Sequence, residues 1–409
     1  MNNMHLNIHF LGGIIKNNQF EYIHDNSIGN IQNAADVFQK KIIYGLENIT
    51  QEELCIINLP FIGSYPKLFK SICSPASKES WLTRSKVINV WFLNIFGIKI
   101  FSRFISSLIA LFKFIPFTKK SILFIYSAHI PFVLAALTYK FFNKNIKICL
   151  IVPDLPEYMG DGNFIYKFLK KIDAALFYLI IKKIHYFVLL TEHMAKKMRL
   201  LTSQYIIIEG IASSGEIYRE HYNYPIETKY FLYSGTLSKR YGIANLIDAF
   251  SMLRHSDVEL WICGNGDGLE YVLDAVKQNV RIKYLGLVPH AKSLFLQQHA
   301  YALVNPRQAI EEYTTYSFPS KIIEYMVAGR PIVMYKMKGV PDEYDPYYFS
   351  PADNSVEALS NCLINILSCN VDTLTEIGSL ARKFILSNKN EIVQSKKILN
   401  FILEEPNVK

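Results

Sequence analysis

Acidic side chains are missing from a long stretch of this sequence. None occurs between Glu79 and Asp154. Residues 1–205 hold 24 Lys and Arg against 12 Asp and Glu, a balance of +12, and residues 206–409 hold 20 against 23, a balance of −3, which together make the net charge of +9. The cations in the first part of the acid-free stretch are Arg84, Lys86, Lys99, Arg103, Lys113, Lys119 and Lys120. We therefore expect this stretch to face an anionic partner.

Four further absences narrow the chemistry. No Asp-x-Asp pair is present to hold a bridging divalent metal, so we expect no metal and no cofactor beyond a co-substrate. The six cysteines lack metal or redox spacing and are expected to be reduced core residues. The apolar run 6–15 is too short for a signal peptide and is broken by Gly12-Gly13. No nucleic-acid recognition motif is present, so nucleic acid is not an expected partner.

The acid-free stretch is also strongly apolar. Between Val87 and Ile115 most side chains are Phe, Ile, Leu or Trp. A membrane-spanning helix is disfavoured because Lys99 and Arg103 would each cost about 2.5–3.5 kcal/mol at its centre. We expect residues 80–120 to form one or two interfacial amphipathic helices with Lys and Arg against acidic headgroups, which places the protein in the cytoplasm at the inner face of the cell membrane. Core helices of an aromatic-rich domain are the alternative.

Strand and helix patterns alternate along both halves of the chain. This alternation predicts an α/β protein with two Rossmann-like, doubly wound domains that face each other across a cleft. Strands are expected at 6–10, 55–59, 122–126, 147–152, 186–190, 230–234, 258–263, 282–285, 301–304 and 332–335. Helices are expected at 33–44, 131–142, 244–253, 269–276, 292–298 and 320–328, with further helices from about 356 to 403. We expect a membrane-facing domain at 1–210, a second domain at 211–385, and a last helix within 386–409 that crosses back to the first domain.

The stretch from Glu311 to Pro331 has the pattern of an anion-binding helix. Pro319 suits the first turn of a helix, Gly329 suits a left-handed cap after its end, and Pro331 prevents continuation. Ser320, Lys321 and Glu324 share the face that is not apolar. Lys321 at the positive end of a helix suggests a phosphate ligand, and Glu324 suits neutral hydroxyls. A surface ion pair between Lys321 and Glu324 is the alternative.

The same stretch resembles the donor motif of retaining glycosyltransferases of family four. Residues 316–326 read Tyr-Ser-Phe-Pro-Ser-Lys-Ile-Ile-Glu-Tyr-Met, preceded by Asn305-Pro306-Arg307 and followed by Ala328-Gly329-Arg330-Pro331. Of the family's two motif glutamates, the second falls on Glu324, which the resemblance implies as the ribose-binding residue. The first falls on Tyr316, a departure that leaves the sugar open. The string is similar to a bacterial capsule and O-antigen subgroup, and it implies the GT-B fold and a nucleotide-sugar donor.

Residues at expected strand ends complete the candidate site. Gly13, His129 and Asp154 follow strands of the first half, where ligands of such sheets bind. His129 resembles the family histidine that reaches the donor sugar, and Asp154 either orients the acceptor or caps a turn. In the second half the loop with Gly235 and Thr236 is similar to the family's first donor loop. Two diphosphate cations usual in that family are absent there, where Thr236 and Tyr241 stand, and Arg307 and Lys321 are the expected replacements.

The resemblance implies a hexosyltransferase, in which we expect 1–210 to be the acceptor-binding domain and 211–385 the nucleotide-sugar-binding domain. It is expected to move a sugar from a nucleotide-sugar donor to a lipid-linked saccharide acceptor, with retention, in bacterial surface polysaccharide synthesis. His129, Asp154, Arg307 and Lys321 are the expected catalytic residues, and the expected donor-binding residues are Gly13, Gly235, Thr236, Arg307, Ser320, Lys321 and Glu324. A GT-B sugar-nucleotide epimerase and a catalytically silent nucleotide-sugar-binding subunit remain open as alternatives.

Overall fold

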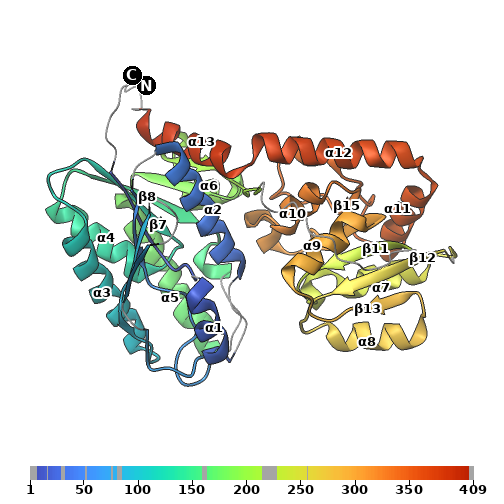
Figure 1. The fold of residues 1–409 in the computed structure, drawn as a ribbon, viewed down its shortest axis with the longest axis horizontal. Coiled ribbons are helices and arrows are strands. Elements are labelled where there is room, and N and C mark those ends of the chain that lie inside the picture. Colours follow the sequence, from blue (N-terminus) through green and yellow to red (C-terminus); the bar gives the residue numbers. More distant parts are fainter. Residues whose placement is uncertain are drawn as a thin grey trace. The chain divides into compact units, whose positions relative to one another are not determined.

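The computed structural model divides into two compact units. It describes residues 7–15, 17–28, 33–50, 53–74, 77–80, 85–158, 164–213, 228–255 and 257–404. The first unit consists of Met1–Ile211 with Glu391–Lys409, and the second is Ala212–Asn390 (Figure 1). The chain therefore leaves the first unit, builds the whole of the second, and returns for its last helix.

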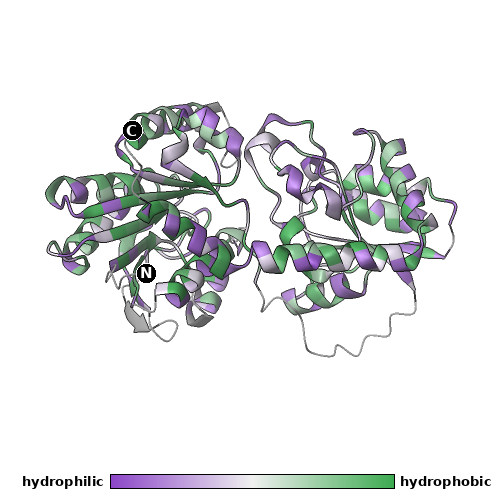
Figure 2. Ribbon diagram, turned by 90° about the horizontal axis from the view of Figure 1, so that it is seen from above, coloured by the Kyte–Doolittle hydropathy of each residue, from purple (hydrophilic) through white to green (hydrophobic). Residues whose placement is uncertain are grey.

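The first unit is built on an eight-stranded sheet in the order β10-β9-β8-β7-β1-β2-β5-β4. Its neighbouring strands are parallel except β4, which pairs antiparallel with β5. The strands are β1 Asn7–Gly12, β2 Cys55–Asn58, β4 Ser77–Ser80, β5 Lys86–Asn89, β7 Ser121–Tyr126, β8 Ile146–Val152, β9 Tyr186–Leu189 and β10 Tyr205–Ile207. The short strands β3 Cys73–Ser74 and β6 Phe92–Leu93 form a separate antiparallel pair. Figure 2 shows that the strands of this unit are hydrophobic along most of their length, as expected for a sheet covered on both faces.

Helices cover this sheet. They are α1 Asn17–Asn26, α2 Asn33–Thr50, α3 Ile98–Phe114, α4 Ile130–Phe142, α5 Phe164–Ile180, α6 Glu192–Met198 and α13 Glu391–Leu403. α13 packs along α2, and α4 packs against both α3 and α5 (Figure 1). The described helices include none with the length and hydropathy that a membrane crossing requires.

The second unit has a five-stranded parallel sheet in the order β13-β12-β11-β14-β15. Its strands are β11 Lys229–Ser234, β12 Val258–Cys263, β13 Ile282–Tyr284, β14 Ala302–Asn305 and β15 Ile332–Met334. Its helices are α7 Ile243–Ser251, α8 Leu269–Gln278, α9 His290–His299, α10 Lys321–Ala328, α11 Val356–Ser368 and α12 Val371–Asn388. The predicted α/β class with two Rossmann-like domains is thus confirmed.

One expectation for the first unit is wrong: Lys99 and Arg103 were expected to face lipid headgroups. α3 lies where an amphipathic helix was expected, but Arg103 is only 1% exposed and points into the unit. Its Nη1 and Nη2 donate to the carbonyl oxygens of Pro60 and Leu59 at 3.0 and 2.7 Å. Lys99 likewise donates to the carbonyl of Ile62. These two cations therefore hold the loop after β2 and do not face headgroups. Arg84, which was counted among the cations, lies outside the described residues.

Candidate functional site

Strand order defines where a ligand would bind in the second unit. After β13 the chain returns to the other side of β11 and adds β14 there, so the direction of strand addition reverses between β11 and β14. Ligands of such sheets bind outside the carboxyl ends of the strands at this reversal. Gly235 and Thr236 directly follow β11, and Arg307 lies two residues beyond β14. Three of the predicted donor residues therefore lie at the expected position.

Helix α10 has the predicted boundaries to within one residue. Ser320 occupies the N-cap position without a capping hydrogen bond from its side chain, and it is exposed. Gly329 ends the helix with φ of 73°, the left-handed conformation that glycine adopts most readily. The apolar positions Ile322, Ile323 and Met326 are buried. The polar N-terminal turn is thereby held at the surface of the unit.

Lys321 and Glu324 form an ion pair on this turn. Nζ of Lys321 lies 2.8 Å from Oε1 of Glu324, whose side chain is 18% exposed. The same oxygen also accepts a hydrogen bond from Nε2 of Gln297. Burial by itself raises the pKa of Glu324, but the charge of Lys321 and the hydrogen bonds from Lys321 and Gln297 together lower it below its usual value. Glu324 is therefore an ionised acceptor at neutral pH.

Gln297, which nothing in the sequence pattern singled out, connects this pair to β11. Its Nε2 lies 3.1 Å from Oγ of Ser234, the last residue of β11. The backbone N–H of Ser234 donates to the Tyr325 hydroxyl at 3.0 Å. Gln297 and Tyr325 are fully buried. The N-terminal turn of α10 is thus fixed to the strand end that carries Gly235.

Arg307 is held beside the same helix. Its Nη2 donates to Oγ of Ser317 at 2.9 Å, and its guanidinium lies over the rings of Tyr241 and Tyr313 at 5.1 and 4.7 Å. Its Nε has no partner among the described residues. Tyr241, at a position where the sequence lacked an expected cation, therefore supports the guanidinium of Arg307 with its ring. Arg307 keeps hydrogen-bonding capacity for an anion.

The glycine-rich loop after β12 has a packing role. An added Cβ at Gly264 would lie 1.8 Å from the carbonyl oxygen of Gly235, and one at Gly266 would lie 2.4 Å from that of Leu237. Gly264 also has φ of 135°. These glycines allow two loops at the carboxyl edge to touch, which fixes the loop of Gly235 and Thr236. Thr236 is exposed, and its carbonyl accepts the Tyr233 hydroxyl at 2.7 Å.

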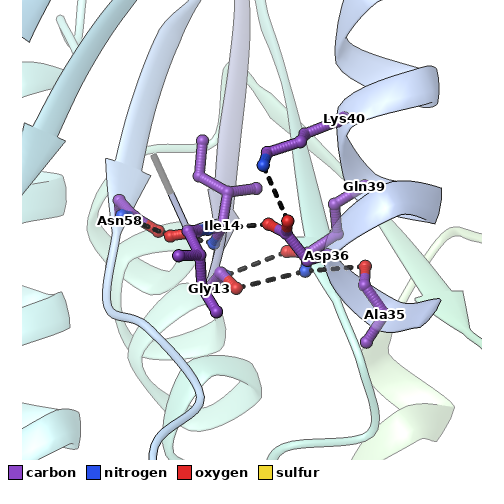
Figure 3. A network of polar contacts seen from close by, with 8 residues as sticks. Gly13, Ile14, Ala35, Asp36, Gln39, Lys40 and Asn58 are labelled. Carbon is purple, nitrogen blue, oxygen red and sulfur yellow. Dashed lines mark hydrogen bonds and ion pairs between the residues drawn. The ribbon is translucent and has the colours of Figure 1, made fainter. Parts of the chain in front are cut away.

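In the first unit the strand order reverses between β1 and β7. Gly13 follows β1, but its N–H already donates to Oε1 of Gln39 at 2.9 Å. The next two N–H groups, of Ile14 and Ile15, donate to Asn58 and Asp36, each at 2.7 Å. Figure 3 shows these side chains turned toward the loop, with Lys40 on the outer oxygen of Asp36. The N–H of Gly13 thus has a partner within the protein. Its predicted contact with a phosphate requires that Oε1 of Gln39 give up this hydrogen bond.

His129 follows β7 and precedes α4. An added Cβ at Gly13 would lie 2.5 Å from the ring of Phe61, and that ring also contacts the imidazole with centroids 5.9 Å apart. Burial first, and then the charges of Arg103 and Lys99, lower the pKa of His129 well below its usual value. Nε2 of His129 is buried without a partner among the described residues. A neutral imidazole at this strand end is suited to a sugar hydroxyl.

Asp154 follows β8, the neighbour of β7, and is exposed. Burial and then the charge of Asp154 raise the pKa of the Tyr126 phenol, which places the carboxylate near the end of β7. Gly13, His129 and Asp154 therefore lie at the ends of three adjacent strands of the first unit. Within the described residues, no group of three His, Cys, Asp or Glu side chains is arranged to hold a metal ion.

Comparison with known proteins shows what this chain is similar to. Residues 215–384 match the model of the family glycosyl transferases group 1. No curated protein matches the chain. Sucrose-phosphate synthase from Thermosynechococcus elongatus has a similar structure, with a TM-score of 0.68 and 12% identity over 97% of this chain and 98% of its own.

Two further solved structures are similar over nearly their whole length. HepE from Anabaena in complex with UDP-glucose has a TM-score of 0.60 at 12% identity and covers 97% of this chain and 99% of its own. TarM from S. aureus, as a mutant in complex with UDP, has 0.61 at 11% and covers 98% and 100%. At such identities these structures show the fold, which is GT-B. With the family match of the second unit, the prediction that this chain is a glycosyltransferase is confirmed.

Proposed function

We propose that this glycosyltransferase moves a hexose from a nucleotide-sugar donor to a lipid-linked saccharide, with retention at the anomeric carbon, as a member of family four. The observation that carries the proposal is the cluster of Arg307, Lys321 and Glu324 at the strand reversal of the second unit. It combines two cations with an ionised carboxylate, as a nucleoside diphosphate with a ribose requires. HepE was solved in complex with UDP-glucose and TarM in complex with UDP, which supports a nucleotide-sugar donor.

The ion pair of Lys321 and Glu324 suits a binding site that is empty between turnovers. Without a ligand, Lys321 compensates the buried charge of Glu324 at 2.8 Å. A bound diphosphate would attract Lys321 toward the N-terminus of α10, and ribose hydroxyls would then donate to Glu324. Gln297 would stay on Glu324 throughout and keep the carboxylate in place. A surface ion pair between Lys321 and Glu324 was the alternative to a binding site. On this proposal, the same ion pair is the form that the site takes without ligand.

The reaction is an exchange of two bonds at the anomeric carbon. The bond from that carbon to the diphosphate oxygen breaks, the acceptor oxygen bonds on the same face, and the acceptor proton passes to the departing phosphate. Arg307 and Lys321 would stabilise the charge that develops on this phosphate, and loss of one such group typically costs about 10²–10³ in rate. His129 would donate to or accept from a sugar hydroxyl, and Asp154 would orient the acceptor hydroxyl.

The acceptor class rests on the first unit. Its acid-free stretch and its exposed apolar helices support a lipid-linked acceptor and a place in the cytoplasm at the inner face of the cell membrane. The similarity of the donor string to capsule and O-antigen enzymes supports a role in bacterial surface polysaccharide. A soluble sugar-phosphate acceptor, as the name sucrose-phosphate synthase describes, is the competing class to be tested.

The test measures release of nucleoside diphosphate and formation of product from a panel of nucleotide sugars. Each donor is offered with a lipid-pyrophosphate saccharide, with a sugar phosphate, or alone. Transfer to the lipid-linked saccharide supports the proposal. Interconversion of donor sugars without transfer would identify an epimerase, and binding without turnover would identify a silent subunit. Because no metal is expected, EDTA should leave turnover unchanged.

Substitutions test the roles of Lys321, Arg307 and Glu324. Lys321→Met and Arg307→Met are each expected to lower turnover about 10²–10³-fold while the protein stays folded. Glu324→Gln should mainly raise the KM for the donor, since it removes a charged acceptor from the ribose. Lys338→Met, at an exposed lysine of the same unit, is the matched control. Ordinary turnover by Lys321→Met would contradict the site.

A further inference from the structure

Helix α3 has its large apolar side chains on the outside. Phe101, Ile105 and Ile109 follow one another at intervals of four residues and are 73, 50 and 60% exposed. The buried positions of the helix are Arg103, Ser107, Ala110 and Leu111, so only part of its inward face is apolar. A helix on the surface of a soluble domain normally has the opposite arrangement, with its apolar stripe toward the core. The outer face of α3 is therefore suited to contact with an apolar partner.

Helix α5, which the sequence pattern did not reveal, repeats this arrangement. Phe168, Ile172, Leu176 and Leu179 lie on one face of the helix and are between 39 and 64% exposed. Ala174 and Phe177 occupy the buried face. Two helices with exposed apolar stripes exceed what scattered surface residues account for.

The two stripes belong to one layer of helices. α4 packs against both α3 and α5. β7, β8 and β9 are parallel and adjacent, and right-handed crossovers put their connecting helices α4 and α5 on the same face of the sheet. α4 adds Phe141 and Phe142 at its C-terminal end, which are 70 and 60% exposed. The outer surfaces of α3, α4 and α5 together are called the α3–α5 face below.

The charges around this face are almost all positive. α3 and α4 contain no acid, and the single acid of α5, Asp173, lies 3.8 Å from Lys170. Exposed lysines follow the three helices or lie on them: Lys113, Lys119, Lys120, Lys144, Lys171, Lys182 and Lys183. A protein partner would more often be matched by charges of both signs, whereas apolar side chains rimmed by lysine are complementary to acyl chains below acidic headgroups.

We propose that the α3–α5 face is the membrane-docking surface of this protein and that its occupant is an anionic lipid bilayer. The side chains of Phe101, Ile105, Ile109, Ile172 and Leu176 enter the acyl boundary, and the surrounding lysines bind the headgroups. This inference deepens the proposed function and rests on it for its purpose, since a lipid-linked acceptor is presented at such a surface. Lys99 and Arg103 take no part, because they hold the loop after β2.

The test compares binding of the full chain to two kinds of vesicle, phosphatidylcholine alone and phosphatidylcholine with phosphatidylglycerol. Co-flotation of the wild type with the anionic vesicles, weakened by salt, is expected. The double variants Ile105→Gln with Ile109→Gln and Ile172→Gln with Leu176→Gln should each lower the partition coefficient about tenfold or more. Val280→Gln with Leu287→Gln is the matched control, because both side chains are 80% exposed in the second unit.

Folding and activity are measured alongside. The substituted side chains are exposed, so melting temperatures should stay within a few degrees of the wild type and transfer to a short water-soluble acceptor should persist. Equal flotation of wild type and α3 or α5 variants would overturn the proposal. So would variants that only convert an oligomer to monomers, because the face would then be a protein interface. A wild type that binds anionic vesicles but transfers no sugar supports the docking surface and contradicts the proposed function.

Discussion

At the scale of residues, the state of Glu324 depends on partners that are distant in sequence. Lys321 is three residues away on the same helix, and its pairing follows from helical spacing. Gln297 comes from α9, 27 residues earlier, and its amide reaches the same oxygen. Spacing therefore predicted half of this arrangement. The other half required the packing of α9 against α10, which no local pattern encodes.

Gln297 is expected to be a positioning residue that acts through Glu324. Gln297→Leu removes a hydrogen bond that lowers the pKa of Glu324, so that pKa should rise. The acid limb of kcat/KM for the donor should then move to higher pH, with an increase of about tenfold in KM and a smaller change in kcat. The measurement is a pH profile of initial rates at several donor concentrations.

Gln298→Leu is the control, because Gln298 is the next residue of α9 and is only partly buried. A Gln297→Leu enzyme whose acid limb stays in place while all rates fall equally would indicate a purely structural role for this amide.

At the scale of elements, most boundaries follow from the alternation of apolar runs and turn residues. The strand expected at 258–263 is β12 Val258–Cys263, and the helix expected at 131–142 is α4 Ile130–Phe142. α5 was missed because its apolar positions occur on two faces, one buried and one exposed, which blurs a single stripe. β4 and β5 were missed because they lie in a segment dominated by the signal for interfacial helices. The direction of Arg103 was mispredicted because the acceptors for its charge are backbone carbonyls, which composition does not show.

Gly45 determines how closely two elements of the first unit approach. It lies inside α2, and an added Cβ would be 2.1 Å from the backbone oxygen of Glu391 and 2.2 Å from Oγ of Ser395 on α13. Alanine inside a helix normally stabilises by about 0.5–1 kcal/mol relative to glycine. Here the overlap with a backbone atom must displace α13, so Gly45→Ala should instead destabilise by about 1–3 kcal/mol.

Denaturant unfolding of the first unit measures this effect. Asn48→Ala, at an exposed position of the same helix, is the control, because it changes helix propensity and removes only the exposed hydrogen bond from Nδ2 to the Tyr44 carbonyl. A higher free energy of unfolding for Gly45→Ala would show that α13 can shift away from α2 without loss of stability.

At the scale of the whole molecule, the two units are expected to respond differently to ligand. The cluster of Arg307, Lys321 and Glu324, the proposed donor site, lies within Ala212–Asn390. A nucleoside diphosphate at about 100 times its Kd should stabilise the folded state to which it binds by about 2.7 kcal/mol. Hydrogen exchange should show the largest protection at α10 and in the loop after β11.

Protection confined to the first unit would contradict the assignment of the nucleotide to the second. Lys321→Met provides the control, since its α10 should lose most of the ligand-induced protection when exchange with ligand is compared with exchange of the same variant without ligand. The uneven charge of the two halves predicted different partners for them, whereas the expectation of a last helix that returns to the first unit did not come from the charge.

The return of the chain has a consequence for biosynthesis. A ribosome completes residues 212–390 before it translates α13, and the entry and exit of that segment are already joined by the bridge between Ala212 and Asn390. The second unit can therefore finish folding before α13 is made. Until then, the surface of α2 that packs against Ile398, Leu399 and Ile402 stays uncovered. A nascent chain that stalls after Asn390 would carry a complete second unit beside a first unit that still lacks α13, so the first unit can complete its fold only after α13 is made.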